Sequence, residues 1–211
     1  IGTTDKLALS GNDIVIKDTT ATAAAVAGVE VTSTATKSTI ELSGATTPAT
    51  VFLNKAQVSE VLISGAGATT ITVNENSKLV LAKNQASAVV ANIDNAKGTL
   101  TTGTLLLDVN ADQTKIITGA NAGTVLLTAG KLADKDGKAQ TVTIKDFITH
   151  TATDTIVVNG ANDLVITKLS SGDADTVVAT AHTGKLTIND FTANTKVFSG
   201  SNDDTFKVAA P

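Results

Sequence analysis

The acidic turns contain the residues of this chain that are best suited to chemistry. "SGDADT" at 171–176 and "SGSNDDT" at 199–205 each place two carboxylates within three residues, beside a glycine. Calcium takes six to eight oxygen ligands, many of them from backbone carbonyls and neighbouring turns. We therefore expect calcium as the cofactor, and stacking of the two turns on one edge would provide its ligands. These expected ligands are Asp173, Asp175, Asn202, Asp203 and Asp204. The alternative is that these residues are solvated turn acids without a metal.

Other metals and other calcium loops fit the sequence less well. The chain has no Cys and only two His, whereas zinc and copper prefer nitrogen and sulfur ligands. "ADKDGK" at 133–138 begins like the calcium loop of an EF-hand. However, Lys138 stands at the third ligand position and Lys145 at the twelfth, where the loop needs Glu. An EF-hand is therefore excluded.

The residues needed for catalysis are missing or isolated. His150 and His182 lie in Thr-rich, turn-like segments, and we expect both imidazoles at the surface. No G-x-S-x-G motif accompanies them as a nucleophile. Carbohydrate-cleaving sites rely on Trp, Tyr and Arg, and none of these residue types occurs in this chain. The sequence therefore predicts that the protein is not an enzyme and binds no organic cofactor.

The composition excludes two kinds of partner. The net charge is −4, and without Arg, Tyr or Trp the chain lacks the usual base-reading and base-stacking side chains, so we expect no nucleic acid. No run of about 18 apolar residues exists, so we expect no membrane span. The absence of Cys favours an exported protein at the cell surface. Because the sequence opens at Ile1, we interpret it as a processed product or a fragment whose export signal can lie outside it.

Positioning the acidic turns requires β-strands, which the hydrophobic pattern predicts along most of the chain. Short aliphatic runs alternate with Thr or Lys and are separated by Gly, Asn, Asp and Ser. "DTIVV" at 154–158, "DTVVA" at 175–179 and "TKVFS" at 195–199 recur about every 20 residues, and a second family recurs between them. The expected strand starts lie near residues 69, 78, 87, 98, 104, 115, 124, 141, 155, 163, 176, 185, 196 and 205.

This spacing predicts an all-β chain whose C-terminal two-thirds form a parallel β-solenoid-like coil of about 20 residues per rung. Each rung would place one strand on each of two faces. We expect Val157, Val178 and Val197 on the same face of adjacent parallel strands. The alternative is a set of β-sandwich modules, whose strands also recur every 8–12 residues.

The periodicity divides the chain into two expected regions. Residues 66–211 form the β-solenoid-like region. Residues 1–65 form a β-rich N-terminal region, because their pattern is less periodic. Within it we expect a hairpin at 28–44 and a short helix at 54–61, where an Asn can cap the first turn.

A short phrase, "GSNDDTFKVA" at 200–209, carries a resemblance to known families. It resembles the Gly-Asn-Asp-x-aliphatic repeat of the repeats-in-toxin family, whose nonapeptides coil into a calcium-loaded parallel β-roll. It is still more similar to degenerate versions inside bacterial surface-layer proteins. The matching residues are Gly200, Asn202, Asp203 and Phe206, and more loosely Gly11, Asn12, Asp13 and Ile14. The match covers about a tenth of the chain, and the tandem Gly-Gly-x-Gly-x-Asp array is missing. The resemblance implies a secreted, repetitive, calcium-bound protein that assembles into a lattice or filament.

We therefore predict a structural subunit of an extracellular assembly, such as a surface layer or filament, that self-associates and is stabilised by calcium. An open-ended solenoid presents unpaired strand edges, which favour a homo-oligomer or lattice. A cell-surface glycan is the candidate anchor. The alternative is an adhesive or ligand-binding module of a larger secreted protein, reading ice or glycans through Thr-x-Thr rows. Those rows, at 32–34 and 141–143, do not recur at the 20-residue period.

Overall fold

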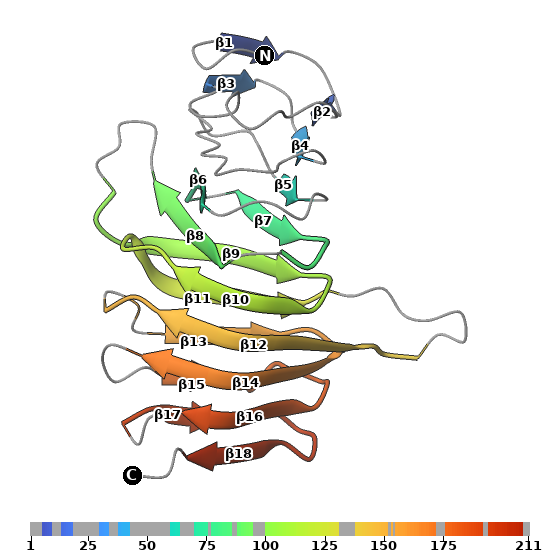
Figure 1. The fold of residues 1–211 in the computed structure, drawn as a ribbon, viewed down its shortest axis with the longest axis vertical. Coiled ribbons are helices and arrows are strands. Elements are labelled where there is room, and N and C mark those ends of the chain that lie inside the picture. The colour runs from blue at the N-terminus through green and yellow to red at the C-terminus, as the bar shows by residue number, and fades with distance from the viewer. Residues whose placement is uncertain are drawn as a thin grey trace.

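Every element that the structure describes is a β-strand (Figure 1). The structure, a computed structural model, describes residues 6–9, 14–18, 30–33, 38–42, 60–63, 70–75, 77–85, 88–94, 100–130, 138–151, 153, 155–171, 176–191 and 194–208. The strands are β1 (Lys6–Leu9), β2 (Ile14–Asp18), β3 (Glu30–Ser33), β4 (Ser38–Leu42), β5 (Glu60–Ile63), β6 (Thr70–Asn74), β7 (Lys78–Leu81), β8 (Val89–Asp94), β9 (Gly103–Val109), β10 (Gln113–Thr118), β11 (Ala122–Ala129), β12 (Thr141–Thr149), β13 (Thr155–Asn159), β14 (Asp163–Ser171), β15 (Thr176–Val178), β16 (Leu186–Phe191), β17 (Lys196–Phe198) and β18 (Thr205–Val208). The expected all-β class is confirmed for these residues.

The strands form three sheets in which neighbouring strands run parallel. A nine-stranded sheet has the order β17-β15-β13-β11-β9-β7-β5-β4-β2, and a seven-stranded sheet has the order β18-β16-β14-β12-β10-β8-β6. β1 and β3 pair separately. From β6 onward the chain alternates between the two larger sheets, so each strand pairs with the strand two places further along. Antiparallel β-sandwich modules are therefore wrong for the described part of the chain.

The pairing register reflects the 20-residue recurrence of the sequence. Thr104 pairs with Thr124, and Thr155 pairs with Thr176, so partners are about 20 positions apart. Thr124 and Thr155 are partners at a wider separation, because the long connection 130–140 lies between their strands. Insertions in the connections thus change the spacing along the chain without changing the pairing.

The core lies between the two larger sheets and consists of aliphatic ladders. Strands such as β8 and β13 alternate buried and half-buried residues, as expected for a strand with one inward face. Equivalent inward residues of neighbouring strands stack about 4.8 Å apart, and each large aliphatic side chain contributes roughly 1.5–3 kcal/mol on burial. One such ladder in the nine-stranded sheet consists of Leu105, Val125, Ile156, Val177 and Val197. Small branched side chains suit this repetitive stacking.

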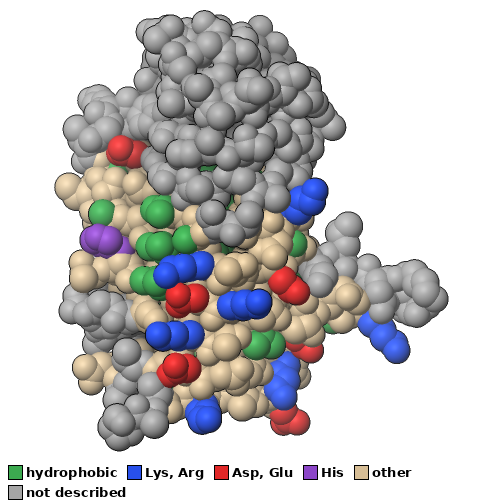
Figure 2. Space-filling model, in the orientation of Figure 1, with side chains coloured by type: hydrophobic (Ala, Val, Ile, Leu, Met, Phe, Trp, Pro, Cys, Tyr) green, Lys and Arg blue, Asp and Glu red, His purple; other side chains and the backbone are tan. Residues whose placement is uncertain are grey.

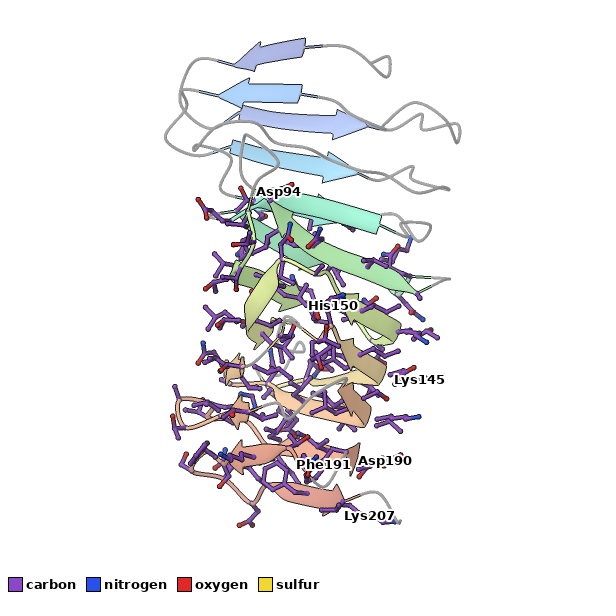
Figure 3. The ribbon with its side chains drawn as sticks, turned by 90° about the vertical axis from the view of Figure 1, so that its left-hand side faces the viewer. Asp94, Lys145, His150, Asp190, Phe191 and Lys207 are labelled. Carbon is purple, nitrogen blue, oxygen red and sulfur yellow. The ribbon has the colours of Figure 1, made fainter. Side chains whose placement is uncertain are left out.

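Strands of the seven-stranded sheet share a bend that the sequence analysis did not anticipate. In β12 the buried residues are Val142, Ile144, Phe147 and Thr149, so two consecutive residues, Lys145 and Asp146, lie between inward positions and face outward. β16 repeats the pattern of buried and outward residues. Figure 3 shows Lys145, Asp190 and Lys207 on the outer side of this sheet and Phe191 between the sheets. The bend therefore places two adjacent polar side chains of β10, β12, β14 and β16 on the surface.

The N-terminal region differs from expectation. The hairpin at 28–44 is wrong, because β3 pairs in parallel with β1 and both edges of β4 are taken by the parallel strands β2 and β5. The short helix at 54–61 is wrong at its end, since Glu60 and Val61 belong to β5; residues 54–59 lie outside the described residues. β5 also pairs with β7, so the nine-stranded sheet continues across residue 65, where we expected a change of region.

The register of the last strands is shifted by one residue from expectation. Val157 and Val178 are partners, as predicted, but Val178 pairs with Phe198, whereas Val197 pairs with Val177. Because successive side chains of a strand point to opposite faces, Val197 faces inward and Phe198 faces outward. The same-face prediction is therefore correct for two of the three valines.

Candidate functional site: the Asn-Asp turns

The carboxylate of Asp204 ties the last described turn to two backbone amides. Its Oδ1 accepts a hydrogen bond from Leu186 N at 2.8 Å, and its Oδ2 accepts one from Gly200 N at 2.9 Å. Leu186 is the first residue of β16, whereas Asp204 immediately precedes β18. The side chain therefore links the beginnings of two neighbouring strands and also closes its own turn.

The two residues before Asp204 have different roles. Asn202 donates from Nδ2 to the carbonyl oxygen of Thr183, in the turn before β16. The carbonyl oxygen of Asn202 accepts from Asp204 N at 2.7 Å. Asp203 is exposed to solvent. Of the predicted ligands at this turn, two thus make hydrogen bonds to backbone groups, and Asp203 is the one that faces solvent.

The related phrase "GANDLVITK" at 160–168 makes the same kind of contact. Asn162 donates from Nδ2 to Ala129 O at 2.9 Å and accepts at Oδ1 from Gln140 N at 3.0 Å. Asp163 accepts at Oδ1 from Lys185 N at 2.8 Å. In both phrases the Asn and Asp side chains bind the backbone of neighbouring turns. The Asn-Asp phrase is therefore a structural unit that connects successive turns.

The glycine of each phrase is needed for close approach to the preceding turn. Gly160 has a φ of 107°, in the left-handed region that favours glycine. A Cβ on Gly200 would lie 2.5 Å from the carbonyl oxygen of His182 and 2.8 Å from that of Ala179. These oxygens are backbone atoms, so they cannot move aside without moving the strand ends.

Of the two acidic turns predicted to share calcium, only the one at 199–205 lies among the described residues. Asp173 and Asp175 lie outside the described residues, in the connection that follows β14. Asn202–Asp204 precedes β18, which runs parallel to β14 in the same sheet. The chain thus leaves the sheet after β14 at one end and enters it before β18 at the other. Because Asp173 and Asp175 are not among the described residues, the calcium site shared by the two turns stays a prediction. Among the described residues there is also no group of three or more His, Cys, Asp or Glu placed to hold a metal.

The two histidines occupy different environments. His150 is exposed, as predicted. His182 is 0% exposed, so its predicted surface position is wrong. Within the part of the chain that the structure describes, neither Nδ1 nor Nε2 of His182 has a hydrogen-bond partner. His182 lies in the connection between β15 and β16, and the polar, Thr-containing sequence around it did not indicate its burial.

The outer face of the seven-stranded sheet carries a ladder of alternating charge. Figure 2 shows lysine and acidic side chains following one another down this face. Lys115 Nζ lies 3.3 Å from Asp146 Oδ2. The pairing register continues the alternation through the strands, giving Lys115, Asp146, Lys168, Asp190 and Lys207. Opposite charges on adjacent strands attract one another and support the parallel register.

An ion-pair cluster lies on the outer side of the nine-stranded sheet. Lys78 Nζ is 3.1 Å from Glu60 Oε2 and 3.0 Å from Asp108 Oδ2. Burial alone would lower the pKa of Lys78, but the hydrogen bonds and charges of Asp108 and Glu60 outweigh burial and raise the pKa. This lysine therefore stays charged and neutralises Asp108.

On β11, β13 and β15 of the same sheet, the outward residues are uncharged. Sequence reasoning missed this face, although the motifs "TLL" at 104–106, "TVL" at 124–126, "TIV" at 155–157 and "TVV" at 176–178 signal it. The register aligns the first residues of these motifs into one column and the last residues into another.

Comparisons of the chain with protein-family models, with curated proteins and with solved structures found no match. In the part of the chain that the structure describes, there is no helix long and apolar enough to cross a membrane.

Proposed function

We propose that the chain is a parallel β-solenoid that serves as a self-associating structural subunit of an extracellular assembly, such as a surface layer or filament. The fold part of the proposal is supported by the alternation of strands between two parallel sheets and by the recurrent register. The resemblance of the Asn-Asp phrase to surface-layer and repeats-in-toxin proteins and the absence of Cys support a location at the cell surface, with a glycan as anchor.

The edge strands of the two sheets, within the described residues, are the observation that carries the proposed self-association. β17 and β18 are the outermost strands of their sheets within the described residues. On them, Phe198 is 53% exposed and Val208 is 50% exposed. An unpaired strand edge bearing apolar side chains is a template for another strand. A strand of a second copy would extend the sheet and lie beside both side chains.

Negative-stain microscopy and light scattering of the wild-type chain test this proposal. We expect ordered sheets or filaments that disappear in Val208→Lys, because Val208 is the register partner of the buried Phe191 on β16 and a strand of a second copy would bury the new charge. Thr167→Lys adds a charge on an exposed residue of the interior strand β14 and serves as the control that keeps assembly. Dispersed monomers of the wild type at high concentration would instead favour the adhesive module.

Calcium enters the proposal as an ion that stabilises the turns. Two features support calcium binding. The carboxylate of Asp203 is exposed, and each carboxylate oxygen of Asp204 still has a free lone pair after it accepts one N–H hydrogen bond. Melting the protein with millimolar calcium and again with a chelator tests this part. We expect a higher melting temperature with calcium and loss of the increase in Asp203→Asn. Identical melting curves would remove calcium from the proposal and leave the hydrogen bonds as the function of the turn.

A further inference from the structure

The outer face of β9, β11, β13, β15 and β17 is a regular array of three residue columns. One column consists of Thr104, Thr124, Thr155, Thr176 and Lys196, and the next consists of Leu106, Leu126, Val157, Val178 and Phe198. The third consists of Asp108, Thr128 and Asn159. Each of these side chains is half-buried or exposed. We call this array the threonine–aliphatic face.

The charge on this face is confined to its two ends. Asp108 lies on β9, where Lys78 neutralises it at 3.0 Å, and Lys196 lies on β17. The outward residues of β11, β13 and β15 are uncharged. The opposite outer face carries a charge in every strand from β10 to β18. Covering the charged face would require the desolvation of a whole ladder of ions, whereas covering the threonine–aliphatic face would not.

The spacing of this face determines which surface can fit it. Each strand forms one ridge of side chains, and these ridges repeat at the strand spacing of about 4.8 Å. Along each strand, residues of neighbouring columns are about 6.6 Å apart. A partner with a different repeat would lose contact after one or two ridges. A second copy of the same sheet has the same repeat, so its side chains interdigitate with these over all five strands, as in stacked sheets about 10 Å apart.

We propose that the threonine–aliphatic face is the lateral contact between copies of this chain, packed face to face. This inference rests on the proposed self-association and identifies a second contact, distinct from the strand edges. Five strands of about 4.8 Å and five residues of about 3.3 Å give a projected area of about 400 Å² per copy, against about 800 Å² per partner in a standard stable interface. The contact is therefore weak in solution and becomes effective in an assembly in which the strand edges already hold the copies together.

The centre of the face provides a specific reporter. Val157 lies on the central strand and in the central column, so a two-fold axis through the middle of the face brings Val157 against Val157 of the second copy. The chain has no Cys, so a single Val157→Cys variant introduces a unique thiol. Val165→Cys is the matched control, because Val165 is also half-buried, on β14 of the charged face.

The test treats both variants with a short bismaleimide over a series of protein concentrations and follows the wild type by light scattering in parallel. We expect Val157→Cys to form cross-linked dimers at least tenfold faster than Val165→Cys. Val157→Lys should abolish lateral growth but leave end-to-end filaments, whereas Val165→Lys should leave both.

Three results would overturn the inference. Equal cross-linking rates in a wild type that assembles would exclude this face and leave the proposed function intact. A wild type that is monomeric at all concentrations would remove the proposed function itself and this contact with it. A monomeric wild type that inhibits ice recrystallisation, with the inhibition lost in Val157→Lys, would assign the face to ordered water instead of a second copy.

Discussion

Replacing Asp204 by Ala removes the two hydrogen bonds that hold the turn before β18, to Leu186 N at 2.8 Å and Gly200 N at 2.9 Å. Each hydrogen bond to a charged group contributes about 1.5–3 kcal/mol. Because Asp204 is half-buried, water replaces part of what is lost, and we expect a cost of about 2 kcal/mol. This corresponds to about a thirtyfold change in an opening equilibrium.

Hydrogen exchange measures this cost where it arises. Stacked strands can open locally, so a whole-chain melting temperature would dilute the effect. We expect the amides of Leu186 and Gly200 to exchange about thirtyfold faster in Asp204→Ala. Asp204→Asn should lose less, because its remaining oxygen can still accept from Leu186 N while its amide group cannot accept from Gly200 N.

Asp203→Ala is the matched control in chelator, where it should change exchange little because Asp203 is exposed. All variants are measured in chelator and in calcium. Equal losses in Asp203→Ala and Asp204→Ala would refute the proposed role of the two hydrogen bonds. So would a chelated wild type that already exchanges as fast as Asp204→Ala, because the carboxylate would then act through a metal.

Three further predictions concern the register, the buried imidazole and the ion-pair cluster. Ile156→Ala should cost about 2–5 kcal/mol in urea unfolding because Ile156 is fully buried, and Val157→Ala on the outer face should cost clearly less; the reverse order would mean that the faces are exchanged. His182→Phe should raise the melting temperature, since it replaces two buried nitrogens without partners by an apolar ring; a decrease would reveal a partner of the imidazole. The raised pKa of Lys78 means that its stabilisation is complete below about pH 10.4, the unfolded value, and is lost as the pH rises through the folded value. The stability difference between wild type and Lys78→Gln should therefore shrink only in strongly alkaline solution, and a difference that shrinks already near neutral pH would contradict the ion pairs.

The strands and their order along the chain were determined by the sequence itself. Alternating Thr and aliphatic residues between Gly, Asn and Asp predicted starts at 141, 155, 163, 176, 196 and 205, and β12, β13, β14, β15, β17 and β18 begin at those residues. The reason is that alternation and turn chemistry are local properties, which a strand carries with it wherever it pairs. The recurrence at about 20 residues also indicated parallel neighbours two strands apart, because only equivalent segments can stack in register.

The tertiary structure determined the features that depend on contacts between turns, namely the exact register, the partners of the turn side chains and the burial of His182. The one-residue shift that turns Phe198 outward arises from pairing across about 20 residues, and strand periodicity looks the same in either register. Asn162 and Asp204 bind backbone groups of other turns, so their roles are not encoded in their own neighbourhood. His182 is buried despite a polar local sequence. The sequence thus specified the repeating unit of strand and turn. The stacking of these units determined which side chains pack in the core, which bond to neighbouring turns and which face solvent.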